Sequence, residues 1–157
     1  MDIILKYFPN LSEVQQQQFA ALYDLYTDWN SKINVISRKD ITNLYEHHVL
    51  HSLGIAKVMQ FRPETTVMDL GTGGGFPGIP LKIAFPELKI TLLDSLNKRV
   101  NFLNEVIEML GLKDVTAIHG RAEDYAKQKE HREKYDFCVS RAVANLSTLS
   151  EYCIPFV

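Results

Sequence analysis

Residues 1–62 have the hydrophobic periodicity of helices. After Ser12, aromatic and aliphatic residues recur at steps of three and four, which is the spacing of one buried helix face. Ser12 and Gln15 have the form of a capping box, so a helix is expected to begin there. A polar break near residues 30–34 precedes a second helix, which is expected to run from a cap at Asp40 to about Gln60. The apolar positions are Phe19, Leu22, Tyr23, Tyr26, Trp29 and Ile33 in the first helix, and Leu44, Tyr45, Val49, Leu53 and Ile55 in the second.

From residue 63 onward the pattern changes to short apolar runs that alternate with helix-length segments. Strands are expected near residues 66–70, 88–93, 115–119 and 135–140, with helices near 96–110, 124–134 and 146–154. Strands joined in this way form a parallel sheet through right-handed crossovers. We therefore predict a doubly wound, Rossmann-like α/β fold over residues 63–157, with helices on both faces, and residues 1–62 packed on it as a helical segment.

A glycine-rich loop ends the first strand and is followed by a helix. Five of the eight positions from Gly71 to Gly78 are glycine, which permits positive φ angles and a close approach of a ligand to the backbone. Pro77 and Pro80 suit the first turn of the next helix, whose free N–H groups favour an anionic group. The loop is therefore predicted to bind a small molecule that carries negative charge.

Two ligand classes fit this loop. Gly73-x-Gly75-x-x-Gly78 matches the dinucleotide fingerprint, which is a weak signal by itself. Asp69-x-Gly71-x-Gly73-x-Gly75 also matches the acidic glycine loop of methyltransferases that use S-adenosyl-L-methionine (SAM). The Asp69 carboxylate would repel a pyrophosphate but could attract the ammonium of SAM. The pattern favours SAM, with Asp69, Gly71, Gly73 and Gly75 as contacts; a dinucleotide and a purely structural glycine turn remain alternatives.

Further candidates follow the other strands, at the edge of the sheet where such folds bind ligands. Asp94 comes about twenty residues after the loop, where a carboxylate commonly accepts hydrogen bonds from ribose; capping of the next helix is its alternative role. Glu123 could begin a helix or lie near the adenine. Arg141 is a charge placed directly after an apolar strand, which favours a ligand or substrate partner.

Composition narrows the possible partners. The formal net charge is −2, with 17 basic and 19 acidic residues, so no strongly basic field indicates nucleic acid. His47, His48 and His51 lack the other ligands of a metal site, and no metal is expected; a position on the surface or at the edge of the core, or contact with RNA phosphate, is preferred. The chain shows neither a signal peptide nor a membrane-length apolar run, and a cytoplasmic protein without a membrane partner is expected.

Taken together, these residues resemble the bacterial 16S rRNA guanine-N7 methyltransferase family, also called glucose-inhibited division protein B. The marks that carry the resemblance are Trp29-Asn30 with Ile33-Asn34, the segment from His48 to Leu53, the loop from Asp69 to Leu81, Arg121-Ala122-Glu123, and Ser140-Arg141-Ala142-Val143. The resemblance implies SAM contacts at Gly71, Phe76, Ala122, Glu123 and Arg141, with Asp94 as the ribose partner. It further implies 16S rRNA or the small ribosomal subunit as partner, and we expect a monomer.

Methylation of guanine N7, which the resemblance implies, agrees with the lack of an evident general base or nucleophile in the sequence. Guanine N7 is unprotonated at neutral pH and can attack the sulfonium methyl without a general base, so alignment and electrostatics carry the catalysis. Arg141 is the candidate catalytic residue. Cys153 lies in an apolar helix without an activating neighbour, which disfavours a cysteine nucleophile. An NAD-dependent oxidoreductase and a non-catalytic rRNA-binding module remain alternatives.

The sequence departs from the family pattern in two places. His51 stands where members often carry the Asp of His-x-x-Asp-Ser-Leu, so no carboxylate is available for a polar contact at this position. The family also continues beyond the position of Val157 with another strand and a hairpin. We therefore expect a chain that is truncated at its C-terminus, with an unpaired sheet edge.

Overall fold

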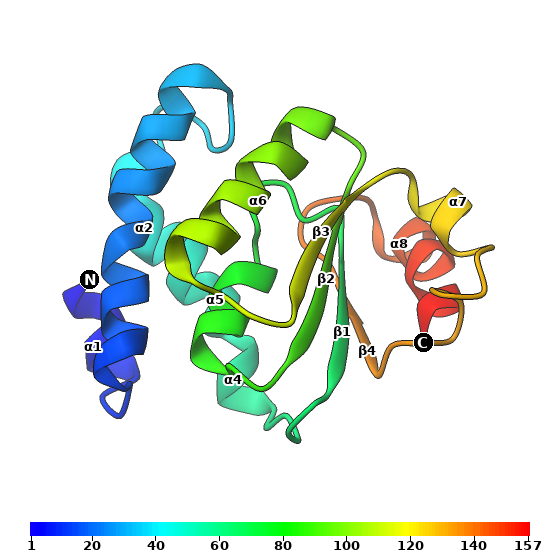
Figure 1. The fold of residues 1–157 in the computed structure, drawn as a ribbon, viewed down its shortest axis with the longest axis horizontal. Helices are drawn as coiled ribbons and strands as arrows, with labels where there is room; N and C mark the ends of the chain where they lie inside the picture. The colour runs from blue at the N-terminus through cyan, green and yellow to red at the C-terminus, as the bar shows by residue number, and fades with distance from the viewer.

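Four parallel strands form the centre of the computed structural model, which describes all 157 residues. They are β1 (Thr66–Leu70), β2 (Lys89–Asp94), β3 (Val115–His119) and β4 (Phe137–Val139), in the spatial order β3-β2-β1-β4 (Figure 1). The chain proceeds outward from β1 to β3 and then returns to the other side of β1, so the strand order reverses there. Asp69 pairs with Leu92 and with Val139, which brings the carboxyl ends of three strands to one edge.

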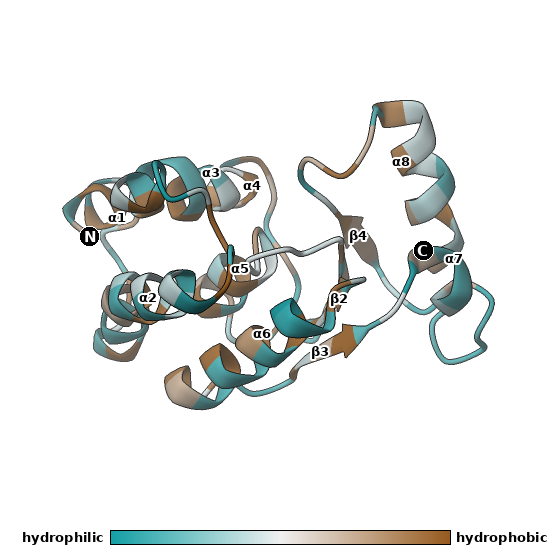
Figure 2. Cartoon of the chain, turned by 90° about the horizontal axis from the view of Figure 1, so that it is seen from above, coloured by the Kyte–Doolittle hydropathy of each residue, from teal (hydrophilic) through white to brown (hydrophobic).

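Helices cover both faces of the sheet, as the alternating pattern predicted. One face carries α5 (Gly78–Ala84) and α6 (Asn97–Leu110), and the other carries α7 (Ala122–Tyr125), α8 (Leu146–Cys153) and η3 (Ile154–Phe156) (Figures 1 and 2). Adjacent residues of a strand point to opposite faces. Accordingly, Val67 belongs to a core cluster of 20 buried residues, while Met68 belongs to a second cluster of 5 that includes Phe156.

The N-terminal helices pack on the face that carries α5 and α6. They are α1 (Asp2–Tyr7) and α2 (Glu13–Lys32). The capping box predicted for α2 is confirmed: the Gln15 amide donates to Ser12 Oγ at 3.2 Å, and the Ser12 amide donates to Gln15 Oε1 at 2.8 Å. Phe19, Leu22 and Tyr26 are fully buried in the larger cluster. The stripe of α2 is therefore core at these positions, as its spacing indicated, whereas Tyr23, which was expected on the same face, is 38% exposed.

The second helical segment is less regular than its sequence suggested. It consists of η1 (Ile41–Asn43), a wide π-helical turn η2 (Leu44–Leu50), α3 (His51–Leu53) and α4 (Ile55–Val58). The prediction that Asp40 caps a helix is wrong, because its side chain makes no capping hydrogen bond. Its carboxylate is bound instead by the imidazoles of His47 and His48.

The polar helix expected at residues 124–134 is also largely absent. Only α7 forms, and turns follow it. Residues 127–134 contain no apolar side chain that could be buried, and short helices depend on such packing for their stability. β4 is likewise shorter than the predicted strand at 135–140. None of the helices has the length and apolar character needed to cross a bilayer.

Candidate cofactor and active site

A cavity of about 320 Å³ opens at the carboxyl ends of the strands. This is where doubly wound sheets bind ligands, beside the point where the strand order reverses. The cavity brings together four residues that the sequence placed in one site: Gly71, Asp94, Ala122 and Glu123. Its other lining residues, which were not among the predicted cofactor contacts, are Leu70, Leu93, Ser95, Arg99, Gly120, Arg121, Ala142, Val143 and Tyr152.

Asp94 braces the glycine loop as well as lining the cavity. Its side chain is almost fully buried, at 3% exposure. Oδ2 accepts the backbone N–H of Gly73 at 2.8 Å, and Oδ1 accepts that of Leu96 at 2.9 Å, next to the start of α6. Arg99 Nη1 lies 3.7 Å from Oδ2. Asp94 therefore ties the loop after β1 to the loop after β2, and these bonds fix the direction of its carboxylate.

The three loop glycines predicted to contact the cofactor face different surroundings. All have positive φ, at 66° for Gly71, 58° for Gly73 and 90° for Gly75. A Cβ on Gly73 would meet nothing within 4 Å, so its backbone borders open space. A Cβ on Gly75 would lie 2.6 Å from Ile79 Cγ1 and 2.9 Å from Leu103 Cδ2. A Cβ on Gly71 would lie 2.5 Å from Val143 Cγ2, but Gly71 lines the cavity. Gly71 and Gly73 remain candidate contacts, while the missing side chain of Gly75 serves packing against the core.

Asp69 is fully buried beneath the loop. Its Oδ2 accepts the Thr72 hydroxyl at 2.7 Å and the Gly78 amide at 2.8 Å, which links the two ends of the loop. Its Oδ1 is buried without a partner, which is uncommon in native proteins. Burial raises the pKa of Asp69 to about 6, although both hydrogen bonds favour the charged form. Asp69 does not line the cavity, so its direct contact with a cofactor stays a prediction.

Phe76 lies between the glycine loop and the N-terminal helices. Its side chain is 4% exposed, and its ring centroid is 5.3 Å from that of Tyr26 and 5.2 Å from that of His48. The Tyr26 hydroxyl donates to the carbonyl of Gly74, which fixes the loop to α2. The structure therefore places Phe76 outside the cavity lining, in the contact between the loop and the helical segment.

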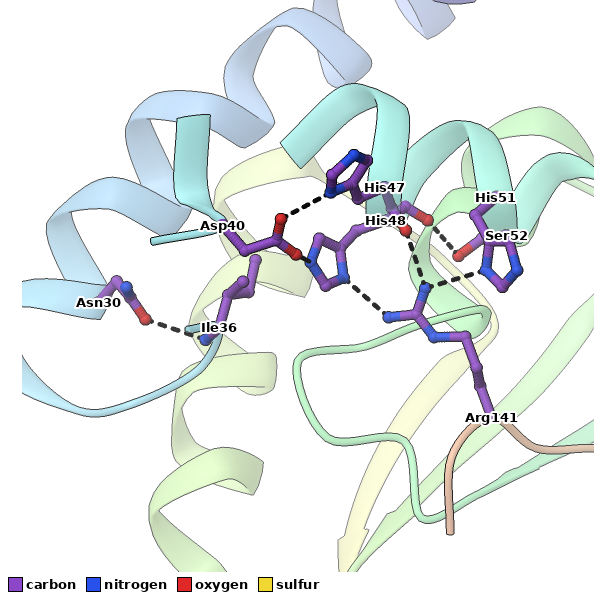
Figure 3. Close-up of polar contacts among 8 residues, drawn as sticks. All are labelled: Asn30, Ile36, Asp40, His47, His48, His51, Ser52 and Arg141. Atoms are coloured by element: carbon purple, nitrogen blue, oxygen red, sulfur yellow. Dashed lines mark hydrogen bonds and ion pairs between the residues drawn. The ribbon is translucent and has the colours of Figure 1, made fainter. Parts of the chain in front are cut away.

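Arg141 joins the loop after β4 to the same helical segment (Figure 3). Its Nη2 donates to His48 Nδ1 at 2.8 Å, and its Nη1 donates to His51 Nδ1 at 3.2 Å and to the His47 carbonyl at 3.3 Å. Its Cζ lies 5.3 Å from the centre of the Phe76 ring, a cation–π distance. Arg141 itself does not line the cavity, although the next residue, Ala142, does.

This arrangement shows what sequence reasoning missed. The histidines were expected on the surface, at the edge of the core or on RNA, and in the structure His47 and His51 are exposed while His48 is half-buried. Their pairing with Asp40 and Arg141 was not expected. Three histidines within five positions were a visible signal of polar function, but a pairing between residues 93 positions apart could not be found by spacing. No cluster of three or more metal-ligating side chains is present in the structure.

Comparison with known proteins identifies the family. The family model described as GidB, rRNA small subunit methyltransferase G, matches residues 15–157. Ribosomal RNA small subunit methyltransferase G of Phocaeicola vulgatus is 67% identical over 149 residues, which cover 95% of this chain and 68% of that protein. The protein of the same name from Bacteroides thetaiotaomicron is also 67% identical, over 95% of this chain and 69% of that protein. The chain spans about two thirds of the length of these relatives.

Solved structures agree on the fold. TYW2 of P. horikoshii in complex with MeSAdo superimposes with a TM-score of 0.59 at 17% identity, over 70% of this chain and 39% of that chain. At this identity the likeness concerns the fold alone, which is a Rossmann-like α/β fold. With the family model covering nearly the whole sequence and close relatives along 95% of it, the chain belongs to the rRNA small subunit methyltransferase G family of SAM-dependent methyltransferases.

Proposed function

We propose that this protein transfers the methyl group of SAM to N7 of a guanine in 16S rRNA, as a cytoplasmic monomer that acts on the rRNA or on the small ribosomal subunit. The observation that carries the proposal is the cavity at the strand ends, where Gly71, Asp94, Ala122 and Glu123 meet. The family membership favours this hypothesis over the NAD-dependent oxidoreductase, since the glycine pattern alone allowed both.

The residues present fit SAM in three respects. The open face at Gly73 gives a ligand access to the backbone. The buried Oδ1 of Asp69, which has no partner, would be satisfied by a cationic group such as the SAM ammonium. Asp94 is held at the cavity wall, where a carboxylate accepts hydrogen bonds from ribose hydroxyls. Ala122 and Glu123 would then flank the adenine end.

Bound SAM supplies an electrophilic methyl group on sulfur. The lone pair of guanine N7 forms the new N–C bond while the S–C bond breaks, and its electron pair stays on the sulfur, so that S-adenosylhomocysteine leaves. No proton is transferred, and no general base is needed. The protein has to align the two reactants and exclude water, which can account for a large share of the rate.

Arg141 is the residue that we assign to this alignment. Three of the five guanidinium N–H groups are engaged, two on Nη1 and one on Nη2. The N–H of Nε and the second N–H of Nη2 have no protein partner. Such a pair forms a planar fork that matches a carboxylate or a phosphate, the anionic groups of the SAM amino-acid end and of rRNA.

Calorimetric titration with SAM, and separately with NADH, tests the cofactor assignment. We expect SAM to bind and NADH not to bind. Asp94→Ala and Gly71→Asp variants that stay folded by circular dichroism should bind SAM at least about tenfold more weakly, a loss of about 1.4 kcal/mol. Glu130→Ala, at an exposed position away from the cavity, is the matched control.

Transfer of labelled methyl from SAM to small ribosomal subunits tests the reaction, and mapping of the modified base tests N7. Binding of NADH alone would establish the oxidoreductase alternative. Salt-sensitive binding to the subunit that is indifferent to SAM, without methyl transfer, would establish the non-catalytic module.

A further inference from the structure

His48 lies between a carboxylate and a guanidinium. Its Nε2 is 2.5 Å from Asp40 Oδ2, and its Nδ1 is 2.8 Å from Arg141 Nη2. A guanidinium has only donors, so Nδ1 has to be the acceptor and the imidazole proton has to reside on Nε2, where it donates to Asp40. Asp40 therefore fixes both the tautomer and the orientation of the ring.

The acceptors that hold Arg141 are uncharged. They are the two imidazoles of His48 and His51 and the backbone carbonyl of His47, while the Phe76 ring lies against the guanidinium. No carboxylate is hydrogen-bonded to Arg141, although Asp69 and Asp40 act on it electrostatically. The contacts thus determine the direction of the guanidinium without neutralising its charge. In Figure 3 the histidines lie at the Nη1 and Nη2 end of the group.

We infer that His48, oriented by Asp40, is a positioning residue for methyl transfer: it accepts one N–H of Arg141 and so directs the remaining N–H fork toward the reactants. This inference rests on the proposed function, in which Arg141 aligns SAM or rRNA. It assigns His48 an action through Arg141, since His48 is absent from the cavity wall.

The inference requires a neutral His48. The charged or titratable groups around it are Asp40, His47 and His51 on the helical segment, Asp69 at the end of β1, and Arg141 after β4. Burial lowers the pKa of His48 and the charge of Arg141 lowers it further, while the hydrogen bond to Asp40 opposes both. A proton on Nδ1 would place a donor and a second positive charge against the guanidinium. Methyl transfer should therefore decline on the acid side as His48 titrates.

Three substitutions separate the two contacts of the imidazole. His48→Asn places an amide oxygen near the position of Nδ1 and keeps the acceptor for Arg141. His48→Leu has nearly the same shape without an acceptor. His48→Gln extends toward the position of Nε2 and keeps only the contact with Asp40.

We expect the Leu and Gln variants to lower kcat for methyl transfer to small subunits by about tenfold or more, because misaligned reactants lose rate steeply. The Asn variant should stay within about threefold of the wild type and lose the acid limb of the pH profile that belongs to His48. In an Arg141→Lys background, His48→Leu should cause almost no further loss of kcat, as expected for two residues that act as a unit. Equal losses in the Leu and Asn variants, or additive losses with Arg141→Lys, would show a merely structural role and overturn the inference.

A spectroscopic measurement separates this inference from the proposed function. In the wild-type chain without SAM or RNA, the ¹⁵N shifts of His48 should report a protonated Nε2 and an unprotonated Nδ1. A proton on Nδ1 would refute the inference whatever the activity. If the wild type transfers no methyl to small subunits, the proposed function fails while the ¹⁵N result still stands. If it transfers methyl and His48→Leu is as active as the wild type, only the inference fails.

Discussion

Asp69→Asn should make the protein more stable at neutral pH and weaken its binding of SAM. The Asp69 carboxylate is fully buried, and its Oδ1 has no partner. Burial raises its pKa from an ordinary value of 3.8 to about 6 in the folded protein. The folded state therefore holds this proton more tightly than the unfolded state, so the free energy of unfolding falls as the pH rises from about 4 to about 6.

The size of the effect follows from the two pKa values. Each pH unit between them corresponds to about 1.4 kcal/mol, so an ionised Asp69 lowers the free energy of unfolding by about 3 kcal/mol relative to a protonated one. An asparagine resembles the protonated acid, because its carbonyl oxygen can still accept the bonds from Thr72 and Gly78. Above pH 6 the variant should gain up to about 3 kcal/mol, and below pH 4 the gain should vanish.

Urea unfolding of both proteins between pH 4 and pH 8 measures this difference, and the other ionisable groups cancel in the comparison. Calorimetry at pH 7.5 should show SAM binding about tenfold weaker in Asp69→Asn, since the negative charge available to the ammonium is removed. A wild type and a variant whose stabilities run parallel across this pH range would refute the argument. A less stable variant at pH 7.5 would also refute it.

Four further substitutions test the geometry of the loop and its supports. Gly75→Ala should lower the free energy of unfolding by about 2–4 kcal/mol, because the new Cβ would enter the space of Ile79 and Leu103 at a positive φ. The matched Gly73→Ala should lower the free energy of unfolding by only about 1 kcal/mol, and it should weaken SAM binding. Urea unfolding and calorimetry distinguish the two, and equal stabilities would contradict the packing role of Gly75. Tyr26→Phe should lower the free energy of unfolding in urea by about 1–3 kcal/mol, because the buried Gly74 carbonyl loses its donor. An unchanged stability would show that this hydrogen bond contributes nothing. Ser12→Ala should lower the free energy of unfolding by about 1 kcal/mol through loss of the capping box, and it should leave SAM affinity unchanged. A change in that affinity would contradict the separation of this helix end from the site.

The sequence predicted most of the fold because its signals were local. The parallel sheet, the helices on both of its faces and the capping box at Ser12 follow from periodicity and short-range motifs. Gly111 ended α6 in the left-handed conformation, as a glycine at that position indicates. One error arose because a short-range capping rule competed with a side-chain pairing that spacing alone does not reveal. Asp40 had the form of a helix cap, and the nearby imidazoles of His47 and His48 took its carboxylate instead.

The candidate site was predictable to a similar extent. Residues at or shortly after the strand ends, such as Asp94 and Glu123, were found because the carboxyl ends of parallel strands meet at one edge. The sequence did not distinguish Gly73, which faces open space, from Gly75, which packs on the core, because both satisfy the same spacing. Tyr152 was missed because the contribution of α8 to the cavity depends on tertiary packing alone.

The shared apolar cluster has a consequence for how the molecule responds to its surroundings. Ile4 and Phe19 of the N-terminal helices and Val67 and Leu92 of the sheet belong to one buried cluster. A cluster of this kind opens as a cooperative unit, so detachment of the helices would also release the loop carbonyl that Tyr26 holds. Any partner that favours the docked helices therefore also favours the ordered loop. By thermodynamic reciprocity, a ligand that orders the loop strengthens the binding of that partner.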